Sequence, residues 1–343
     1  MTPDKTYTDT WDVVGAVTFS KPLGYLAQGR DFDGTLRIAE QAIDYFAWVG
    51  CIPWLDHVFD KNRIYRLGPP GFGSITGDAI NYLVSRYQGT DGAYHSPSQP
   101  DYLDKFIEAK AANPDTVDDN QIVSWLMINM LAGADTTSII LRSALYYSLK
   151  NPRVWNKLRH ELASAGLTTE RARKAPFSYK EARAVPYLEA VVREALRYLP
   201  GVALSLERYV PPGGHTLPDG SFVPQGVALA FNPYVLCRND EAYGQDAHLF
   251  RPERWLRNLD GGESEEAFAA RLRLMNDADL SFGAGSRICI GQHMGLMQVS
   301  KVVATLAAKY DIALEHPDRE WKVINSWFPR QEGLDVRMTK RVG

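Results

Sequence analysis

The sequence predicts a mainly α-helical protein with small β-sheets. Most of the first 200 residues carries apolar side chains at helical spacing, interrupted by strong punctuation such as the Gly-Pro-Pro-Gly run at 68–71. After residue 200 the pattern changes, and short apolar segments flank a Pro-Asp-Gly turn at 218–220, which indicates a hairpin. A further short strand is expected over 227–231. Since the chain has no repeats, low-complexity segments or clear linker, we expect residues 1–343 to form a single domain.

Composition narrows the functional class. The chain has 343 residues, 45% of them hydrophobic, which is ample for a large core, and its net charge of −3 shows no basic excess for nucleic acid. Its three cysteines, Cys51, Cys237 and Cys289, are odd in number and far apart, which favours a reducing compartment over a disulfide framework. The apolar run 122–134 is interrupted by polar residues and is shorter than a membrane span. No signal peptide is evident at the start.

The longest expected helix runs from about residue 118 to about residue 149. Asp118 and Asp119 suit a helix start, and apolar residues between Gln121 and Leu145 occur on every face. This helix is therefore expected to be buried through a large protein. A long irregular stretch is expected over 237–281, and further helices over 36–47, 77–87, 100–112, from Asn151-Pro152 onward, 186–199 and 289–310.

The sequence FGAGSRICIG, residues 282–291, has the properties of a ligand-binding loop. Gly283 and Gly285 permit a tight loop, and helical spacing begins after Cys289. A cysteine at a helix N-terminus feels the positive end of the helix dipole, which favours the thiolate, and Arg287 adds positive charge. A metal-bound thiolate is therefore chemically reasonable at Cys289.

Two other interpretations of Cys289 stand beside this one. Free cysteine is among the most buried residue types, so Cys289 could be a small hydrophobic core residue. It could also be a nucleophile with His293 as its base, although no third group that would orient the base is evident.

The complete pattern resembles a known signature. Phe282, Gly285, Arg287, Cys289 and Gly291 match the haem-binding motif of the cytochrome P-450 family, Phe-x-x-Gly-x-Arg-x-Cys-x-Gly, at every fixed position. The resemblance implies the mainly α cytochrome P-450 fold and heme b (iron protoporphyrin IX) with Cys289 as the axial iron ligand. It also implies that Arg287 pairs with a haem propionate and that Phe282 packs beside the sulfur.

A second set of residues resembles the charge cluster of that family. Glu194 and Arg197 are three residues apart and share a helix face, which on its own is typical of an exposed ion pair. They resemble the family's Glu-x-x-Arg motif, and Arg254 in FRPERW resembles the third member. The resemblance implies a structural role for all three residues.

The long helix contains Ala-Gly-Ala-Asp-Thr-Thr at 132–137. Glycine and threonine are costly within a helix, and the pattern on its own suits a tolerated kink. The stretch resembles the family's distal-helix motif, which implies that Asp135 and Thr136 handle protons during catalysis.

Other residues are assigned by the same resemblance. Arg208 resembles an arginine that reaches the second propionate region, although on its own it would suit a surface arginine. Trp327 and Phe328 are expected to close the substrate pocket, although two aromatic residues near a chain end are more often core residues. Four small, mostly apolar residues are expected to face a lipophilic substrate: Val202, Ala203, Leu204 and Ser205.

The resemblance covers essentially the whole chain but only the C-terminal two-thirds of the family pattern. The expected fold therefore lacks its N-terminal part, namely the anchor, most of the first sheet and the early helices. Residues 12–31 and 243–256 are similar to the fungal branch that includes pisatin demethylase. Cys237 stands where relatives usually carry histidine.

The implied function is a haem-thiolate monooxygenase of secondary metabolism. It would insert one oxygen atom from O2 into an apolar organic substrate, by hydroxylation or O-demethylation, with electrons from NADPH-cytochrome P-450 reductase. The family usually lies at the cytoplasmic face of the endoplasmic reticulum membrane, and without an anchor this chain is expected to be cytoplasmic or peripheral. The alternatives are a truncated, non-catalytic relative unable to retain haem and a haem-thiolate isomerase or dehydratase.

Overall fold

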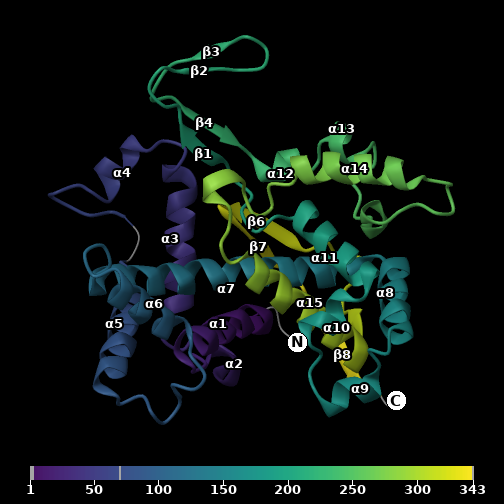
Figure 1. Ribbon diagram of the computed structural model, residues 1–343, viewed down its shortest axis with the longest axis horizontal. Helices are drawn as coiled ribbons and strands as arrows, with labels where there is room; N and C mark the ends of the chain where they lie inside the picture. The colour runs from purple at the N-terminus through teal and green to yellow at the C-terminus, as the bar shows by residue number, and fades with distance from the viewer. Residues whose placement is uncertain (1–3, 69–70, 342–343) are drawn as a thin grey trace. The chain divides into compact units, whose positions relative to one another are not determined.

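The computed structural model describes residues 4–68 and 71–341, which form two compact units. The first unit comprises the described residues up to Arg142 together with Ile312–Thr339. The second comprises Ser143–Asp311 and the described chain from Lys340 onward. Helices predominate and the sheets are small, so the predicted fold class is confirmed (Figure 1).

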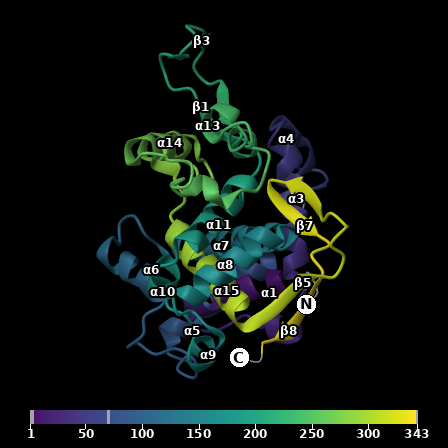
Figure 2. The ribbon, with the colours of Figure 1, turned by 90° about the vertical axis from the view of Figure 1, so that its right-hand side faces the viewer.

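The first unit contains most of the N-terminal helices. They are α1 (Asp4–Phe19), α2 (Tyr25–Gln28), α3 (Thr35–Val49), α4 (Trp54–Phe59), α5 (Gly73–Gln88), α6 (Tyr102–Ala112) and the first part of α7 (Asp119–Lys150). The hairpin of β6 (Lys322–Ser326) and β7 (Phe328–Glu332) belongs to the same unit and lies beside α3 (Figure 2).

The second unit continues α7 and carries the cysteine loop. Its helices are α8 (Pro152–Ser164), α9 (Thr169–Lys174), α10 (Tyr179–Arg183), α11 (Pro186–Tyr198), α12 (Pro233–Leu236), α13 (Asp240–Tyr243), α14 (Glu265–Ala278) and α15 (Gln292–Lys309), with 3₁₀ turns η1 (Pro252–Trp255) and η2 (Gly285–Arg287). Its strands are β1 (Leu206–Tyr209), β2 (His215–Thr216), β3 (Phe222–Val223) and β4 (Ala228–Phe231).

The small sheets of the described chain are two-stranded. β1 pairs antiparallel with β4, and the predicted hairpin is present as β2 and β3, which Figure 1 shows at the far end of the β1–β4 ribbon. The remaining two sheets pair β6 with β7, and β5 (Tyr310–Leu314) with β8 (Val336–Lys340). No helix within residues 4–68 and 71–341 is both long and apolar enough to cross a membrane.

The core of the first unit is built on one stripe of α7. Ile122, Leu126, Met130 and Ala134 recur every four residues, so they share a helix face, and all four are buried. This stripe packs in one cluster with apolar side chains of α1 and α5. Burial of each such side chain contributes roughly 1.5–3 kcal/mol, so this contact fixes α1 against α7.

Two expectations about these elements were wrong, and a third, the start of α8, is confirmed. α7 is not buried on every face, because Ile128 in its N-terminal half is 65% exposed. α8 begins at Pro152 with Asn151 as its N-cap residue, as expected, and the Nδ2 of Asn151 donates 2.7 Å back to the carbonyl of Tyr147. The stretch 237–281 is not wholly irregular, because it contains the 14-residue helix α14.

Candidate functional site

The cysteine loop, residues 282–291, adopts the tight turn that its glycines predict. Gly283 and Gly285 have φ angles of 71° and 63°, in the left-handed region that favours glycine. The backbone N–H of Cys289 donates 2.8 Å to the carbonyl of Phe282 and closes the loop. α15 begins three residues after Cys289, at Gln292, so the thiol precedes the helix N-terminus.

The surface around Cys289 suits a flat apolar ligand. The thiol is exposed, Ile290 beside it is 99% exposed, and Ile288 is 45% exposed. The interpretation of Cys289 as a buried core residue is therefore wrong. Apolar side chains that surround an accessible soft sulfur donor form a surface that an apolar, metal-containing ligand would cover.

The remaining loop residues occupy distinct positions. Arg287 is exposed, whereas Phe282 is partly buried and lines a cavity of about 300 Å³ together with His293. No hydrogen bond joins Cys289 to His293 in the described part of the chain, so the geometry of a nucleophile and its base is not formed there.

Glu194, Arg197 and Arg254 lie together in the interior of the second unit, and we call them the charge cluster. Arg197 donates from Nε and Nη2 to the two oxygens of Glu194, at 2.9 and 2.8 Å, and Arg254 donates from Nε at 3.0 Å. The side chains of Glu194 and Arg197 are both 0% exposed, and that of Arg254 is 1% exposed. Two buried guanidinium groups therefore share one buried carboxylate.

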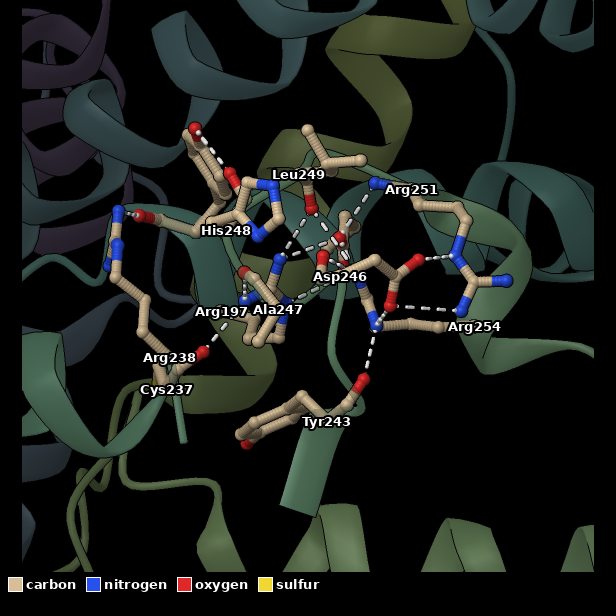
Figure 3. A network of polar contacts seen from close by, with 12 residues as sticks. Arg197, Cys237, Arg238, Tyr243, Asp246, Ala247, His248, Leu249, Arg251 and Arg254 are labelled. Carbon is tan, nitrogen blue, oxygen red and sulfur yellow. Dashed lines mark hydrogen bonds and ion pairs between the residues drawn. The ribbon is translucent and has the colours of Figure 1, made fainter. Parts of the chain in front are cut away.

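The charge cluster fixes the segment 237–254 to α11 (Figure 3). Arg197 donates to the carbonyls of Cys237, Ala247 and Leu249. Arg254 donates to the carbonyls of Tyr243 and Asp246 and to the carboxylate of Asp246. Because these carbonyls lie in a segment with little regular structure, the arginines supply the hydrogen bonds that a sheet or helix would otherwise provide.

Glu194 accepts two further hydrogen bonds from residues that lie outside the Glu-x-x-Arg motif. The indole Nε1 of Trp255 donates 2.9 Å to one oxygen, and the backbone N–H of Arg251 donates 2.8 Å to the other. A buried carboxylate with this many donors is held in one orientation.

Cys237 lies beneath this network with its thiol buried. Burial raises the pKa of the Cys237 thiol to about 11, above its ordinary value of 9.0. The folded protein therefore keeps this proton over a pH range in which the unfolded chain releases it, so stability is lost as the pH rises from about 9 to about 11.

This thiol should make a measurable contribution to alkaline sensitivity. We expect the free energy of unfolding to fall by on the order of 2 kcal/mol more in the wild type than in Cys237→Ala between about pH 8 and about pH 11. Urea unfolding of both proteins at each pH measures this difference in unfolding free energy. Equal pH dependence of the two proteins would contradict a buried, neutral thiol.

Asp135 and Thr136 lie on the part of α7 that belongs to the first unit. Asp135 is buried and its Oδ1 accepts a hydrogen bond of 3.0 Å from the indole Nε1 of Trp11. The hydroxyl of Thr136 donates 2.8 Å to the carbonyl of Ala132, one helical turn earlier. The predicted acid and hydroxyl are therefore adjacent, and each has a defined partner.

A cavity of about 470 Å³ in the first unit has Asp135 in its wall. Its lining combines charged side chains, among them Glu40, Arg142 and Arg330, with apolar ones such as Phe328. Trp327 packs elsewhere, because a Cβ at Gly50 would lie 2.9 Å from its ring. Of the two aromatic residues assigned to a pocket, the structure places Phe328 alone at this cavity.

The residues before and within β1 lie in the second unit. Arg208 is exposed, and its Nη1 donates 2.6 Å to the carbonyl of Glu207. Leu206, on the same strand face, would lie 4.0 Å from a Cβ at Gly283, which places β1 beside the cysteine loop. The segment 202–205 is largely covered, and Ala203 within it is buried.

Comparison with known proteins identifies the family. The family model described as Cytochrome P450 matches residues 10–333. The chain belongs to the cytochrome P450 family. It is 50% identical over 333 residues to cytochrome P450 monooxygenase cfoH of Aspergillus candidus, covering 97% of this chain and 60% of that protein. It is 33% identical to cytochrome P450 monooxygenase pkfB of Emericella nidulans, and the match covers 97% of this chain and 62% of that protein. It is also 33% identical to cytochrome P450 monooxygenase mpaDE of Penicillium brevicompactum, and that match covers 96% of this chain and 37% of that protein.

The chain therefore spans about 60% of the length of the first two of these cytochrome P450 relatives. The family match extends over both compact units. A cytochrome P450 implies a haem cofactor, and the residues of the cysteine loop fit it, because an exposed thiol lies between exposed isoleucines on a closed loop.

Two residues of the site were missed from the sequence. Trp255 follows Arg254 directly, so the FRPERW stretch offered a local signal for it. Trp11 is 124 positions from Asp135, and no spacing rule connects residues so far apart. In this cytochrome P450, the charge cluster forms within the second unit, and the Trp11–Asp135 pair forms within the first.

Proposed function

We propose that this protein is a haem-thiolate monooxygenase in which the Cys289 thiolate is the axial ligand of heme b. The observation that carries the proposal is the exposed Sγ of Cys289 on a glycine loop closed by its own backbone N–H. The names of the fungal relatives support monooxygenation as the reaction class. The proposed reaction is hydroxylation or O-demethylation of a small lipophilic substrate in secondary metabolism.

Each proposed residue has a defined task in this function. Bound haem supplies the redox chemistry that activates O2. Cys289 provides the sulfur ligand, Arg287 pairs with a propionate carboxylate, and Phe282 packs beside the sulfur. Arg208 is proposed to approach the second propionate region from β1. Asp135 holds and transfers protons, and Thr136 offers a hydroxyl beside it.

The charge cluster is proposed to act on the site through structure alone. It ties the segment 237–254 to α11 and so supports the fold that presents the cysteine loop. Residues 202–205 are proposed to contact the substrate.

The proposal includes an electron donor and a location. Electrons come from NADPH-cytochrome P-450 reductase. The protein itself is proposed to be cytoplasmic or peripheral, and the family usually lies at the cytoplasmic face of the endoplasmic reticulum membrane. We expect purified, haem-loaded protein to bind close to one haem per chain and to give the carbon monoxide difference band of thiolate ligation. A haem-free chain, or a band typical of a nitrogen ligand, would contradict the proposal. Turnover of a peroxide without O2 or reductase would instead indicate an isomerase or dehydratase.

The three cysteines allow a second test with internal controls. Cys51 and Cys289 are exposed and Cys237 is buried, so iodoacetamide should modify the first two in haem-free protein and spare the third. Loading with haem should protect Cys289 and leave Cys51 reactive, as peptide mass spectrometry would show. Equal labelling of Cys289 with and without haem would remove it from the ligand role.

A further inference from the structure

The proton-handling residue Asp135 is held by a tryptophan from a distant part of the chain. Trp11 lies on α1 and Asp135 on α7, and their side chains are 1% and 6% exposed. The indole Nε1 donates 3.0 Å to Oδ1 of the carboxylate. A neutral donor that faces a buried carboxylate forms a charge-assisted hydrogen bond, which is stronger and more directional than a neutral one.

The contact belongs to an ordered pairing of the two helices. Three positions along α1 meet three positions along α7 in opposite order: Trp11 contacts Asp135, Val14 lies near Gly133, and Thr18 accepts 2.6 Å from Asn129. α1 and α7 therefore run antiparallel over this stretch. The register is set by both polar and apolar contacts, so Trp11 has little freedom to leave Asp135.

Gly133 permits this close approach. A Cβ at this position would lie 3.2 Å from Cγ2 of Val14, which is tighter than most ordinary contacts. A larger residue at 133 would push α1 outward by a few tenths of an ångström and lengthen the bond to Asp135. The glycine next to the acid on α7 thus serves the contact with α1.

On the basis of the proposed function, we propose that Trp11 is a positioning residue that fixes the Asp135 carboxylate in the wall of the cavity that Phe328 also lines. The cavity, about 470 Å³ in volume and lined by Glu40, Ser138 and Arg330 among others, gives Asp135 access to water. In the proposed function, Asp135 takes up a solvent proton that enters through this cavity and later releases it, so the carboxylate regains its charge in each cycle. By fixing one carboxylate oxygen, the indole limits rotation of the group between these two tasks.

The contact itself can be tested without activity. In 15N-tryptophan-labelled full chain, Trp11→Phe removes one of eight indole resonances and so assigns it. That resonance should shift when Asp135 is replaced by asparagine, whereas the resonance of Trp155 should not. Trp155 is a matched control, because it is also buried and its Nε1 has no hydrogen-bond partner within the described residues. A Trp11 resonance that Asp135→Asn leaves unmoved would overturn the proposal whether or not haem is bound.

The positioning role is tested in the haem-loaded protein. Trp11→Phe should keep the thiolate carbon monoxide band but lower the fraction of NADPH that yields product by roughly tenfold, with the remainder lost as peroxide. The dependence of its rate on pH should also change on the acid side, because the carboxylate of Asp135 loses a hydrogen-bond donor. Trp155→Phe should change neither quantity.

A double-mutant cycle separates positioning from packing. If the indole acts through Asp135, Trp11→Phe has no further effect on coupling or pH profile in the Asp135→Asn background. Equal losses in both backgrounds, or equal losses in the Trp11 and Trp155 variants, would show that the indole only fills the core. Protein that binds no haem would refute the proposed function, and with it the catalytic role of this contact, while the resonance experiment would still report the contact itself.

Discussion

Replacing Glu194 by glutamine should destabilise the protein by about 3–5 kcal/mol, a large part of the roughly 5–15 kcal/mol that stabilises an ordinary domain. The carboxylate balances two guanidinium groups, of Arg197 and Arg254, that are 0% and 1% exposed. A neutral amide keeps the volume but leaves both charges without a counterion in the interior. Its NH2 group also faces donors, so at least one hydrogen bond is lost. Urea unfolding followed by circular dichroism measures the change.

An exposed pair with the same spacing provides the control. Lys105 and Glu108 on α6 form an i,i+3 ion pair at 2.9 Å, as Glu194 and Arg197 do, but their side chains are 54% and 61% exposed. Glu108→Gln should change stability by less than about 1 kcal/mol, because water screens such pairs. Similar effects of the two substitutions would show that burial does not determine the strength of the charge cluster.

In the charge cluster, residue spacing predicts which side chains share a helix face but not whether they are buried. The i,i+3 spacing of Glu194 and Arg197 predicts a shared helix face, but spacing alone equally suits an exposed pair. Their complete burial depends on the segment 237–254, whose carbonyls the two arginines bind. That segment has little periodicity, so its path could not be derived from the sequence, and Arg254 was found by resemblance alone.

The sequence contains a helix-start signal for α14, but the weak apolar pattern of the helix obscures it. Ser264 accepts a hydrogen bond from Ala267 as an N-cap, and two glutamates follow it in the first turn. These features predict a helix start. Met275 is, however, the one residue of α14 that is fully buried, so the apolar stripe that usually reveals a helix is weak.

α7 shows the opposite error. Apolar residues on every face predicted burial on every face, whereas Ile128 is largely exposed and the i,i+4 stripe from Ile122 to Ala134 forms the core contact. Hydrophobicity indicates which side chains can be buried, but neighbours in space decide which ones are. The Trp11–Asp135 contact follows the same rule, since it arises from the register of two helices that are more than 100 residues apart.

Replacing Cys289 by serine should abolish the thiolate carbon monoxide band while leaving the fold intact. A serine hydroxyl is a poor substitute for a thiolate on iron, so thiolate ligation is lost with the sulfur. Because Cys289 is exposed and the loop is closed by its backbone N–H, the substitution should alter unfolding free energy by no more than about 0.5 kcal/mol. The expected result is thus the reverse of that for Glu194→Gln, which acts first on stability.

Cys51→Ser is the matched control for this substitution. Cys51 is also exposed, on a turn after α3, and its thiol donates only a weak 3.5 Å contact to the carbonyl of Ala47. The control should retain the band, the haem content and the stability of the wild type. If Cys289→Ser kept the thiolate band, another sulfur would have to be the ligand. Cys237 is buried, and its carbonyl accepts a hydrogen bond from Arg197 of the charge cluster, so it could bind iron only after this contact was broken. Loss of the band together with unfolding would assign Cys289 a structural role instead, so the spectrum and the unfolding curve must be measured on the same preparation.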